Sequence, residues 1–322
     1  MRAYLLRRLL QAVPLLFGIS VLLFVALQMT PGGPLAVAED VQGRVTAEDL
    51  QRLRNRYGLD DPMYVQYLRW AGDLLRGDWG TSFDTGRPVL VTIAERVPTT
   101  LLLTGTAFLV TLILSIPIGL LAAVRQYSGF DYASTSVAFL GVSIPSFWFG
   151  LMLLYVFTFL LGWLPSVGLS DPRHDYTGWA AAGDLARHLV MPVAVLALVS
   201  TATNTRYVRA AMLDVIGHDY VRTARAKGLT EMAVVGKHAV KNGAIPVVTI
   251  LALEIPDLFI GAVITESIFA IPGMGRLFVQ SASLRDYPVL MGILMTASVL
   301  VIVSNLVADA LYALLDPRIR YR

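Results

Sequence analysis

Long stretches without a charged residue alternate along the chain with blocks that hold the charges. Five such stretches cover residues 9–38, 97–124, 132–170, 188–205 and 287–308. A sixth apolar stretch, over roughly residues 245–270, is interrupted only by Glu254 and Asp257. An α-helix needs about 20 largely apolar residues to cross a bilayer. Each stretch is therefore long enough for one crossing.

The pattern predicts an all-α polytopic membrane protein with six transmembrane helices. We place these helices at about residues 9–29, 99–124, 133–160, 188–208, 246–270 and 288–310. The strands of a membrane β-barrel alternate apolar and polar residues over about 10 positions. The stretches in this chain are continuously apolar, so helices are the expected spanning elements.

The composition supports this interpretation and excludes several classes of protein. The chain has 322 residues, of which 56% are hydrophobic and 15% are charged, whereas soluble domains carry roughly 25% charged residues. Too few polar side chains are present to cover a water-soluble core of this size, which argues against a cytosolic enzyme and a disordered chain. Cysteine is absent, and the histidines at positions 174, 188, 218 and 238 lack metal-ligand spacing. We therefore expect no metal or cofactor site in this chain.

The basic residues predict the orientation in the membrane. If the N-terminus is inside, the inner segments carry 14 basic residues and five acidic ones. The short outer segments then carry only four basic residues. Because lysine and arginine concentrate in short cytoplasmic loops, we expect both termini to be cytoplasmic.

A cleaved signal peptide is the alternative interpretation of the N-terminus, because Ala36-Val37-Ala38 resembles a small-residue cleavage site. The apolar run before it is longer than the 7–15 residues of a signal-peptide apolar region. Proline and glycine at residues 31–34 also end a helix by their backbone chemistry. We therefore expect the first helix to be retained.

The predicted topology divides the chain into three parts. These are the N-terminus with the first transmembrane helix (1–29), an extracytoplasmic helical segment (30–98) and a five-helix core (99–322).

In the extracytoplasmic segment, Thr46 and Asp49 form a capping box that opens a helix ending near Gly58. Asp61-Pro62 opens a second helix, which ends near Gly77. The segment is too small for a core of its own. It is interpreted as a lid packed on the membrane helices or as a docking surface for an external protein, and both can hold.

The cytoplasmic loop over residues 206–244 contains a short amphipathic stretch. It reads Asp219-Tyr220-Val221-Arg222-Thr223-Ala224-Arg225-Ala226-Lys227-Gly228. Ala224 and Gly228 are four residues apart, so they are predicted to share one helical face, with three basic side chains beside it. The stretch is either a short helix that inserts into a groove on another protein or a solvated basic loop.

This stretch resembles the cytoplasmic coupling loop of ABC-importer permeases, in particular their peptide-permease branch. The general signature of that family is Glu-Ala-Ala, three residues and Gly. Arg222, Thr223 and Ala224 occupy the first three places here and Gly228 the last, so only the second alanine and the glycine match. The fuller Arg-Thr-Ala-Arg-Ala-Lys-Gly string is similar to the peptide-permease version.

Further strings resemble family motifs at the corresponding places in the topology. They are Thr30-Pro31-Gly32-Gly33-Pro34, in which Gly33 departs from Asp; Gly77-Asp78-Trp79-Gly80-Thr81-Ser82; Glu266-Ser267-Ile268-Phe269 with Pro272-Gly273-Met274-Gly275; Arg285-Asp286-Tyr287-Pro288; and Leu315-Asp316-Pro317-Arg318. Their order along the chain identifies it as a member of the family. Within the outer loop between the last two helices, Glu266, Pro272, Gly273 and Gly275 are the candidate gate residues.

The resemblance implies a transport subunit of the bacterial plasma (inner) membrane that forms half of a translocation pathway. The implied partners are a second related permease, two cytoplasmic ATPase subunits, an extracytoplasmic substrate-binding protein and membrane lipid, without nucleic acid. ATP and Mg would bind to the ATPase subunits, because this chain lacks the Gly-x-x-x-x-Gly-Lys-Ser/Thr phosphate cradle and is not expected to be an enzyme. Coupling to the ATPases is assigned to Asp219, Tyr220 and residues 222–228. Peptides are the expected substrates, with nickel chelates and oligosaccharides as alternatives.

Glu254 and Asp257 are candidate pathway residues in the fifth predicted helix. They are three residues apart and so are predicted to face the same way. Charges at this depth are costly and rarely face lipid. They either line the pathway and attract a cationic group, such as a peptide amino terminus, or pair with polar groups of a neighbouring helix or the partner permease.

Two other classes of function fit the sequence less well. A secondary transporter or channel would need ion-coupling or filter elements within one chain, and no internal repeat is visible. An intramembrane enzyme would need a nucleophile or metal motif such as His-Glu-x-x-His, which the sequence lacks.

Overall fold

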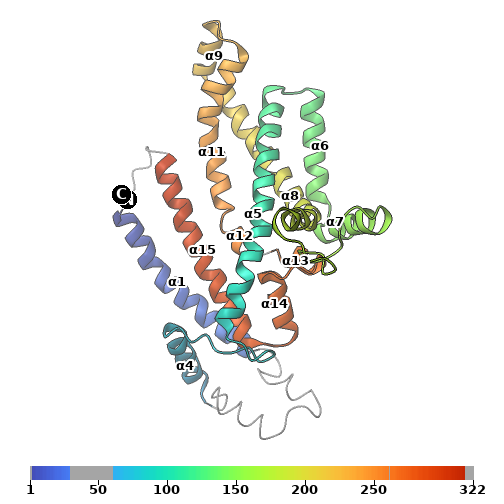
Figure 1. The fold of residues 1–322 in the computed structure, drawn as a ribbon. Helices are drawn as coiled ribbons and strands as arrows, with labels where there is room; N and C mark the ends of the chain where they lie inside the picture. The colour runs from blue at the N-terminus through green and yellow to red at the C-terminus, as the bar shows by residue number, and fades with distance from the viewer. Residues whose placement is uncertain (1, 30–60, 261, 316–322) are drawn as a thin grey trace.

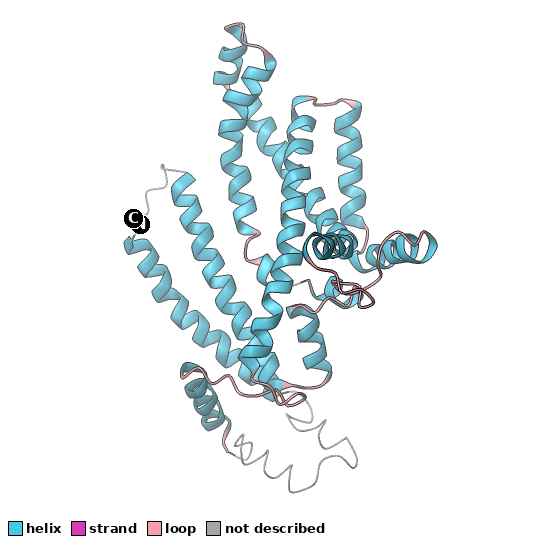
Figure 2. Cartoon of the chain, viewed as in Figure 1, coloured by secondary structure: helices cyan, strands magenta, loops and turns pink. Residues whose placement is uncertain are grey.

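A computed structural model describes residues 2–29, 61–260 and 262–315 (Figure 1). Within these ranges the chain is helical, and its strand-like pairing is limited to one isolated bridge between Thr81 and Pro88 (Figure 2). The all-α prediction is confirmed for this part of the chain. The predicted capping box at Thr46 and the helix ending near Gly58 lie outside the described residues. So do the motifs at residues 30–34 and 316–318.

Four helices of the described part are long and apolar enough to cross a membrane. They are α1 (Arg2–Gln28), α5 (Val89–Val124), α8 (Gly178–Ile216) and α15 (Tyr287–Leu315). Each contains one of the predicted crossings and extends beyond it, because the polar flanks continue the helix. Pro14, Pro117 and Pro192 lie within these helices without ending them.

The predicted continuous helix over residues 133–160 is wrong. The structure has α6 (Gly129–Ser143) followed by α7 (Ser146–Leu153) and the π-helical segment η1 (Leu154–Leu160). The chain bends by 98° between α6 and α7. Ile144 adopts an extended backbone conformation at the bend, because the ring of the following proline disfavours the helical conformation there. This pair counts as a fifth crossing if it is taken as one bent span.

The predicted helix over residues 246–270 is also interrupted. It consists of α11 (Val240–Leu253), α12 (Asp257–Ile260) and α13 (Val263–Ile268). Pro256 lies in the first break, where its missing N–H removes a helical hydrogen bond. Neither α11 nor the segments after it reach the length of the four long helices.

The remaining helices lie at the two ends of the bundle. They are α4 (Met63–Leu75) and α14 (Met274–Ser283) at one end, and α9 (Asp219–Ala226), α10 (Glu231–Ala233) and the π-helical η2 (Val234–Ala239) at the other (Figure 1). The helix predicted after Asp61-Pro62 is confirmed as α4. Gly77 and Gly80 follow it with φ of +86° and +77°, which turns the chain tightly.

The seam between α5 and α8 is the main packing contact of the bundle. Leu103 and Ala107 of α5 are buried against Leu189 and Val193 of α8. Lipid tails are as apolar as leucine, so association inside a membrane depends on close packing more than on hydrophobic transfer. Gly119 provides such packing, because a Cβ atom there would lie 2.7 Å from Val208 Cβ.

The described part of the segment predicted to be extracytoplasmic packs on the long apolar helix α1. The Tyr67 ring of α4 lies 5.5 Å from the Phe24 ring of α1, and its hydroxyl lies 2.9 Å from Ser20 Oγ. Trp70 contacts Phe24 as well. This contact is what the lid interpretation predicts, and the docking interpretation stays a prediction.

Candidate functional site

The end of the bundle that carries α9 is a compact hairpin. Val221 and Ala224 of α9 are buried against Val234 of η2. Helix α9 ends at Ala226, and Gly228 follows it with φ of +79°. This left-handed conformation favours glycine just beyond a helix end. The prediction that Ala224 and Gly228 share one helical face is therefore wrong. Ala224 is buried inside the hairpin, whereas Gly228 lies beyond the end of helix α9.

The outer face of α9 is polar and exposed. The exposed residues of α9 are Asp219, Tyr220, Arg222, Thr223, Arg225 and Ala226, and the exposed Lys227 and Gly228 follow directly after the helix. Arg222 pairs with Asp219. Arg225 donates to both carboxylate oxygens of Glu231, at 3.0 and 2.7 Å. Lys227 has no ion-pair partner among the described residues, so the tip of the hairpin carries one uncompensated cation beside an open glycine.

The Arg225–Glu231 pair predicts a pH dependence of the hairpin. The hydrogen bonds from Arg225 hold the pKa of Glu231 below its ordinary range. Because the folded-state pKa is lowered, the pair stabilises the hairpin above the ordinary glutamate pKa. This contribution is lost as the pH falls through the lowered value. Hydrogen-exchange protection of α9 should therefore fall on acidification. The fall should be up to about fivefold, since exposed pairs contribute about 0–1 kcal/mol.

Glu231→Gln is the control for this prediction. Its protection factors at neutral pH should already be reduced and should not change further on acidification. An equal pH dependence of the parent protein and Glu231→Gln would contradict the assignment.

A buried ion pair joins α6 to the helix that leads into the hairpin. Arg209 of α8 donates from Nε to Asp131 Oδ1 at 2.6 Å and from Nη2 to Oδ2 at 2.8 Å. The backbone N–H of Tyr127 also donates to Asp131. Asp131 is only 2% exposed. The sequence offers one local signal, because Asp131 follows the helix-capping Ser128 by three residues.

Glu254 lies in the break between α11 and α12. Its Oε2 accepts a hydrogen bond from Asn204 Nδ2 of α8 at 3.1 Å. Asn204 is buried, and its Oδ1 has no partner. Asp257 begins α12 and is exposed. Pairing with a neighbouring helix, one of the two interpretations, therefore holds for Glu254. The two acids do not belong to one continuous helix, and their pathway role stays a prediction.

The structure brings the four candidate gate residues together at the α4 end of the bundle. Glu266 is fully buried and accepts from Thr100 Oγ1 at 2.8 Å and from the Arg276 backbone N–H at 2.9 Å. A Cβ atom at Gly273 would lie 2.4 Å from the Glu266 carboxyl carbon. One at Gly275 would lie 2.6 Å from Val263 Cα.

These glycines leave room for a buried carboxylate between α5, α13 and α14. Pro272 lies in the turn before α14, and its carbonyl accepts from Arg96 at 3.4 Å. The contacts of these four residues link α5, α13 and α14, and this set of contacts is called the tie across the outer loop below.

A second buried carboxylate holds two of the family-like motifs together. Asp286 accepts from Ser82 Oγ at 2.5 Å and from the Phe83 N–H at 3.1 Å. Its partners lie about 200 positions away in sequence and follow the turn at Gly77 and Gly80. The segment after α4 is thus anchored to the start of α15.

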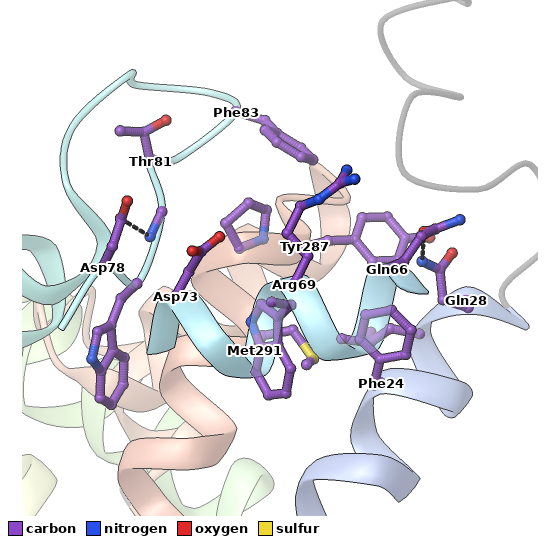
Figure 3. Close-up of a pocket in the computed structure, with 15 residues that line it drawn as sticks. Phe24, Gln28, Gln66, Arg69, Asp73, Asp78, Thr81, Phe83, Tyr287 and Met291 are labelled. Atoms are coloured by element: carbon purple, nitrogen blue, oxygen red, sulfur yellow. Dashed lines mark hydrogen bonds between the residues drawn. The ribbon is translucent and has the colours of Figure 1, made fainter. Parts of the chain in front are cut away.

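A cavity of about 300 Å³ lies between α1, α4 and the start of α15. Figure 3 shows Phe24, Tyr287 and Met291 with polar side chains of α4 around it. Gln28 of α1 donates to Gln66 of α4 at 2.8 Å across one wall. The cavity is apolar with a polar rim, and it marks the junction of the outer segment with the membrane helices.

Comparison with known proteins places the chain in a family. The family described as "Binding-protein-dependent transport system inner membrane component" matches residues 115–321. The N-terminal pattern of such membrane components matches residues 1–104. The chain belongs to this family. The family is a membrane component of ABC transporters and not their catalytic subunit, so the chain is an ABC-importer permease subunit.

Relatives of this permease cover its full length. It is 45% identical over 322 residues to the oligopeptide transport system permease protein AppB of Bacillus subtilis (strain 168), covering 100% of both chains. It is 37% identical over 337 residues to the dipeptide transport system permease protein DppB of Alkalihalophilus pseudofirmus, again covering 100% of both. These matches confirm the resemblance to peptide permeases.

Solved structures of the MetNI methionine ABC transporter in inward-facing conformations share the fold. For the native crystal form the TM-score is 0.53 at 18% identity, covering 70% of this permease and 97% of that chain. For a second crystal form, soaked with SeMet, the TM-score is 0.56 at 17% identity, with 70% and 96% covered. At this identity the likeness supports the fold alone.

Proposed function

We propose that this permease forms half of the translocation pathway of a peptide importer in the bacterial plasma membrane. Its full-length 45% identity to an oligopeptide permease carries the proposal. The other half would come from a second related permease. Two ATPase subunits, which would bind ATP and Mg, would supply the energy, and an extracytoplasmic binding protein would deliver the substrate.

The proposed topology has six crossings with both termini in the cytoplasm. The crossings are α1, α5, the bent pair α6 with α7–η1, α8, the broken segment α11–α13, and α15. Two features support it. The excess of basic residues falls on the segments at the α9 end, and α4 lies at the opposite end (Figure 1).

The α9 hairpin is the proposed contact with the ATPase subunits. It extends beyond the ends of α5 and α6 (Figure 1). Its exposed face carries Tyr220, Lys227 and Gly228. The buried contact with Val234 and the Arg225–Glu231 pair would let the hairpin respond as one body when the ATPases close.

The Gly228→Arg variant tests this contact. A Cβ atom at Gly228 meets nothing within 4 Å, so the longer side chain would project from the hairpin into the proposed interface. We expect normal membrane insertion but loss of the ATPase stimulation that the loaded binding protein causes in the assembled complex. An obstructed close contact typically costs about 1–3 kcal/mol.

Gly86→Arg is the matched control. Gly86 also has a positive φ, of +67°, and open space around it, but it lies on the segment before α5. Full stimulation in Gly228→Arg, or equal loss in Gly86→Arg, would reject the docking role of the hairpin.

Assembly and substrate require a second experiment. Mass spectrometry of the gently solubilised complex should find two ATPase chains and a second permease, and the captured binding protein should carry peptides. Solute accumulation by this permease alone, reconstituted in vesicles under an ion gradient, would overturn the proposal.

A further inference from the structure

A small polar cavity lies between the outer part of α5 and the start of α14. Its volume is about 150 Å³, and its lining residues are Arg96, Pro272, Gly273, Arg276, Leu277 and Gln280. Helix α14 lies at the same end of the bundle as α4 and opposite α9 (Figure 1). In the proposed topology this end faces the extracytoplasmic side.

The cavity contains two guanidinium groups without a carboxylate partner. Arg96 reaches only the Pro272 carbonyl, at 3.4 Å, and its buried Nε has no hydrogen-bond partner. Arg276 donates from Nη1 to the Ala270 carbonyl at 2.5 Å. No carboxylate of the described residues lies within ion-pair distance of either group.

Two acidic residues beside these arginines, Glu266 and Glu95, bond to groups other than the two guanidinium groups. Glu266 lies behind the cavity, where both of its oxygens accept hydrogen bonds from Thr100 and the Arg276 backbone. Glu95, next to Arg96 in sequence, pairs with Arg87 at 2.6 Å. The cavity is therefore lined by two arginines that form no ion pair with a described residue, and one buried donor of Arg96 lacks an acceptor.

The chemistry and size of the cavity fit a single carboxylate. The planar guanidinium fork matches the two oxygens of a carboxylate and forms short, charge-assisted hydrogen bonds with it. Sites for whole small molecules usually enclose about 300–1,000 Å³, so this cavity is too small to hold an entire peptide. It has room for the end of one side chain presented from a protein surface.

We propose that Arg96 and Arg276 bind an aspartate or glutamate side chain of the extracytoplasmic substrate-binding protein when it docks. This inference rests on the proposed function, which supplies the binding protein and the orientation. The docked carboxylate would accept from the terminal guanidinium donors of Arg96 and Arg276 that line the cavity. Because Arg276 lies in the first turn of α14 and its backbone N–H donates to Glu266, docking would act directly on the tie across the outer loop.

The test is a titration of ATPase activity in the complete complex, embedded in lipid nanodiscs, with its own peptide-loaded binding protein. Arg96→Gln and Arg276→Gln should each raise the concentration for half-maximal stimulation about tenfold, which corresponds to about 1.4 kcal/mol. Added salt should weaken stimulation more in the parent complex than in the variants, since the attraction is between opposite charges. Arg96→Lys and Arg276→Lys keep the charge without the fork and should fall between parent and glutamine variants.

Arg87→Gln is the matched control. It removes a nearby arginine that already pairs with Glu95 on the exposed surface, so its titration should match that of the parent complex. An unshifted titration in both cavity variants, or an equal shift in Arg87→Gln, would overturn the proposal.

A separate arm distinguishes a substrate carboxylate from a protein carboxylate. Import of peptides is compared with import of their C-terminal amides. If the cavity variants lose only the preference for the free carboxylate, with an unshifted titration, the docking assignment is overturned. If the binding protein does not stimulate even the parent complex, both the proposed function and this inference fail.

Discussion

Asp131→Ala is expected to destabilise the permease by about 1–3 kcal/mol, the usual cost of leaving hydrogen-bond donors of a partly buried pair without their charged acceptor. The change leaves the Arg209 guanidinium without its countercharge and removes the acceptor of the Tyr127 N–H. Arg209 lies on the helix that leads into the α9 hairpin, so stimulated ATPase activity should fall as well. Thermal unfolding of the detergent-solubilised protein measures the stability.

Two further variants decide whether the ion pair is responsible. Asp219→Ala removes an aspartate whose arginine partner lies on the exposed surface, and such pairs contribute about 0–1 kcal/mol. The double variant Asp131→Ala/Arg209→Ala should lose less stability than the sum of the single variants, because neither charge is then left alone. Strict additivity would contradict a direct coupling.

Gly119→Ala is expected to separate α5 from α8 where Gly119 approaches Val208. The new Cβ atom would lie 2.7 Å from Val208 Cβ and 2.8 Å from the Thr205 carbonyl oxygen. A backbone oxygen cannot rotate away, so the helices themselves must move. The expected loss is about 1–3 kcal/mol, measured by thermal unfolding, with reduced stimulated ATPase activity.

The same helix offers the matched control. A Cβ atom at Gly105 meets nothing within 4 Å. Gly105→Ala should therefore be neutral or stabilising by roughly 0.5–1 kcal/mol, because glycine is unfavourable inside a helix. Similar effects at the two positions would show that helix propensity, and not the close approach at Gly119, determines the stability of the seam.

The long helices were predictable from the sequence because lipid imposes a simple requirement. A crossing segment must satisfy its backbone internally and avoid charges, and α1, α5, α8 and α15 each show this as a charge-free run. The breaks at Ile144 and Pro256 were not predictable in the same way. Proline is tolerated within α1, α5 and α8, whereas Pro145 and Pro256 lie at the two breaks. The outcome depends on whether neighbouring helices provide partners for the backbone groups that a proline leaves without a hydrogen bond.

The candidate site was predictable where a motif is local. The Arg222–Gly228 string marked the hairpin, and the strings around Glu266 and Gly273 marked the tie across the outer loop. The burial of Ala224 was not predictable from the local sequence, because it depends on Val234, which packs against Ala224 only once the hairpin has formed. The ion pair of Asp131 and Arg209 spans 78 positions, and the anchor of Ser82 on Asp286 spans 204. Contacts at such separations depend on the tertiary fold, which residue spacing does not reveal.

The small core of Val221, Ala224 and Val234 has a mechanical consequence. Helix α8 leads into the hairpin, and η2 leads out of it into α11. A displacement of the hairpin tip would therefore reach α8 and α11 at the same time. The Asn204–Glu254 hydrogen bond joins α8 to the end of α11 at a second place. A displacement of the hairpin would therefore move α8 and α11 together, and the hydrogen bond of Glu254 would move with them.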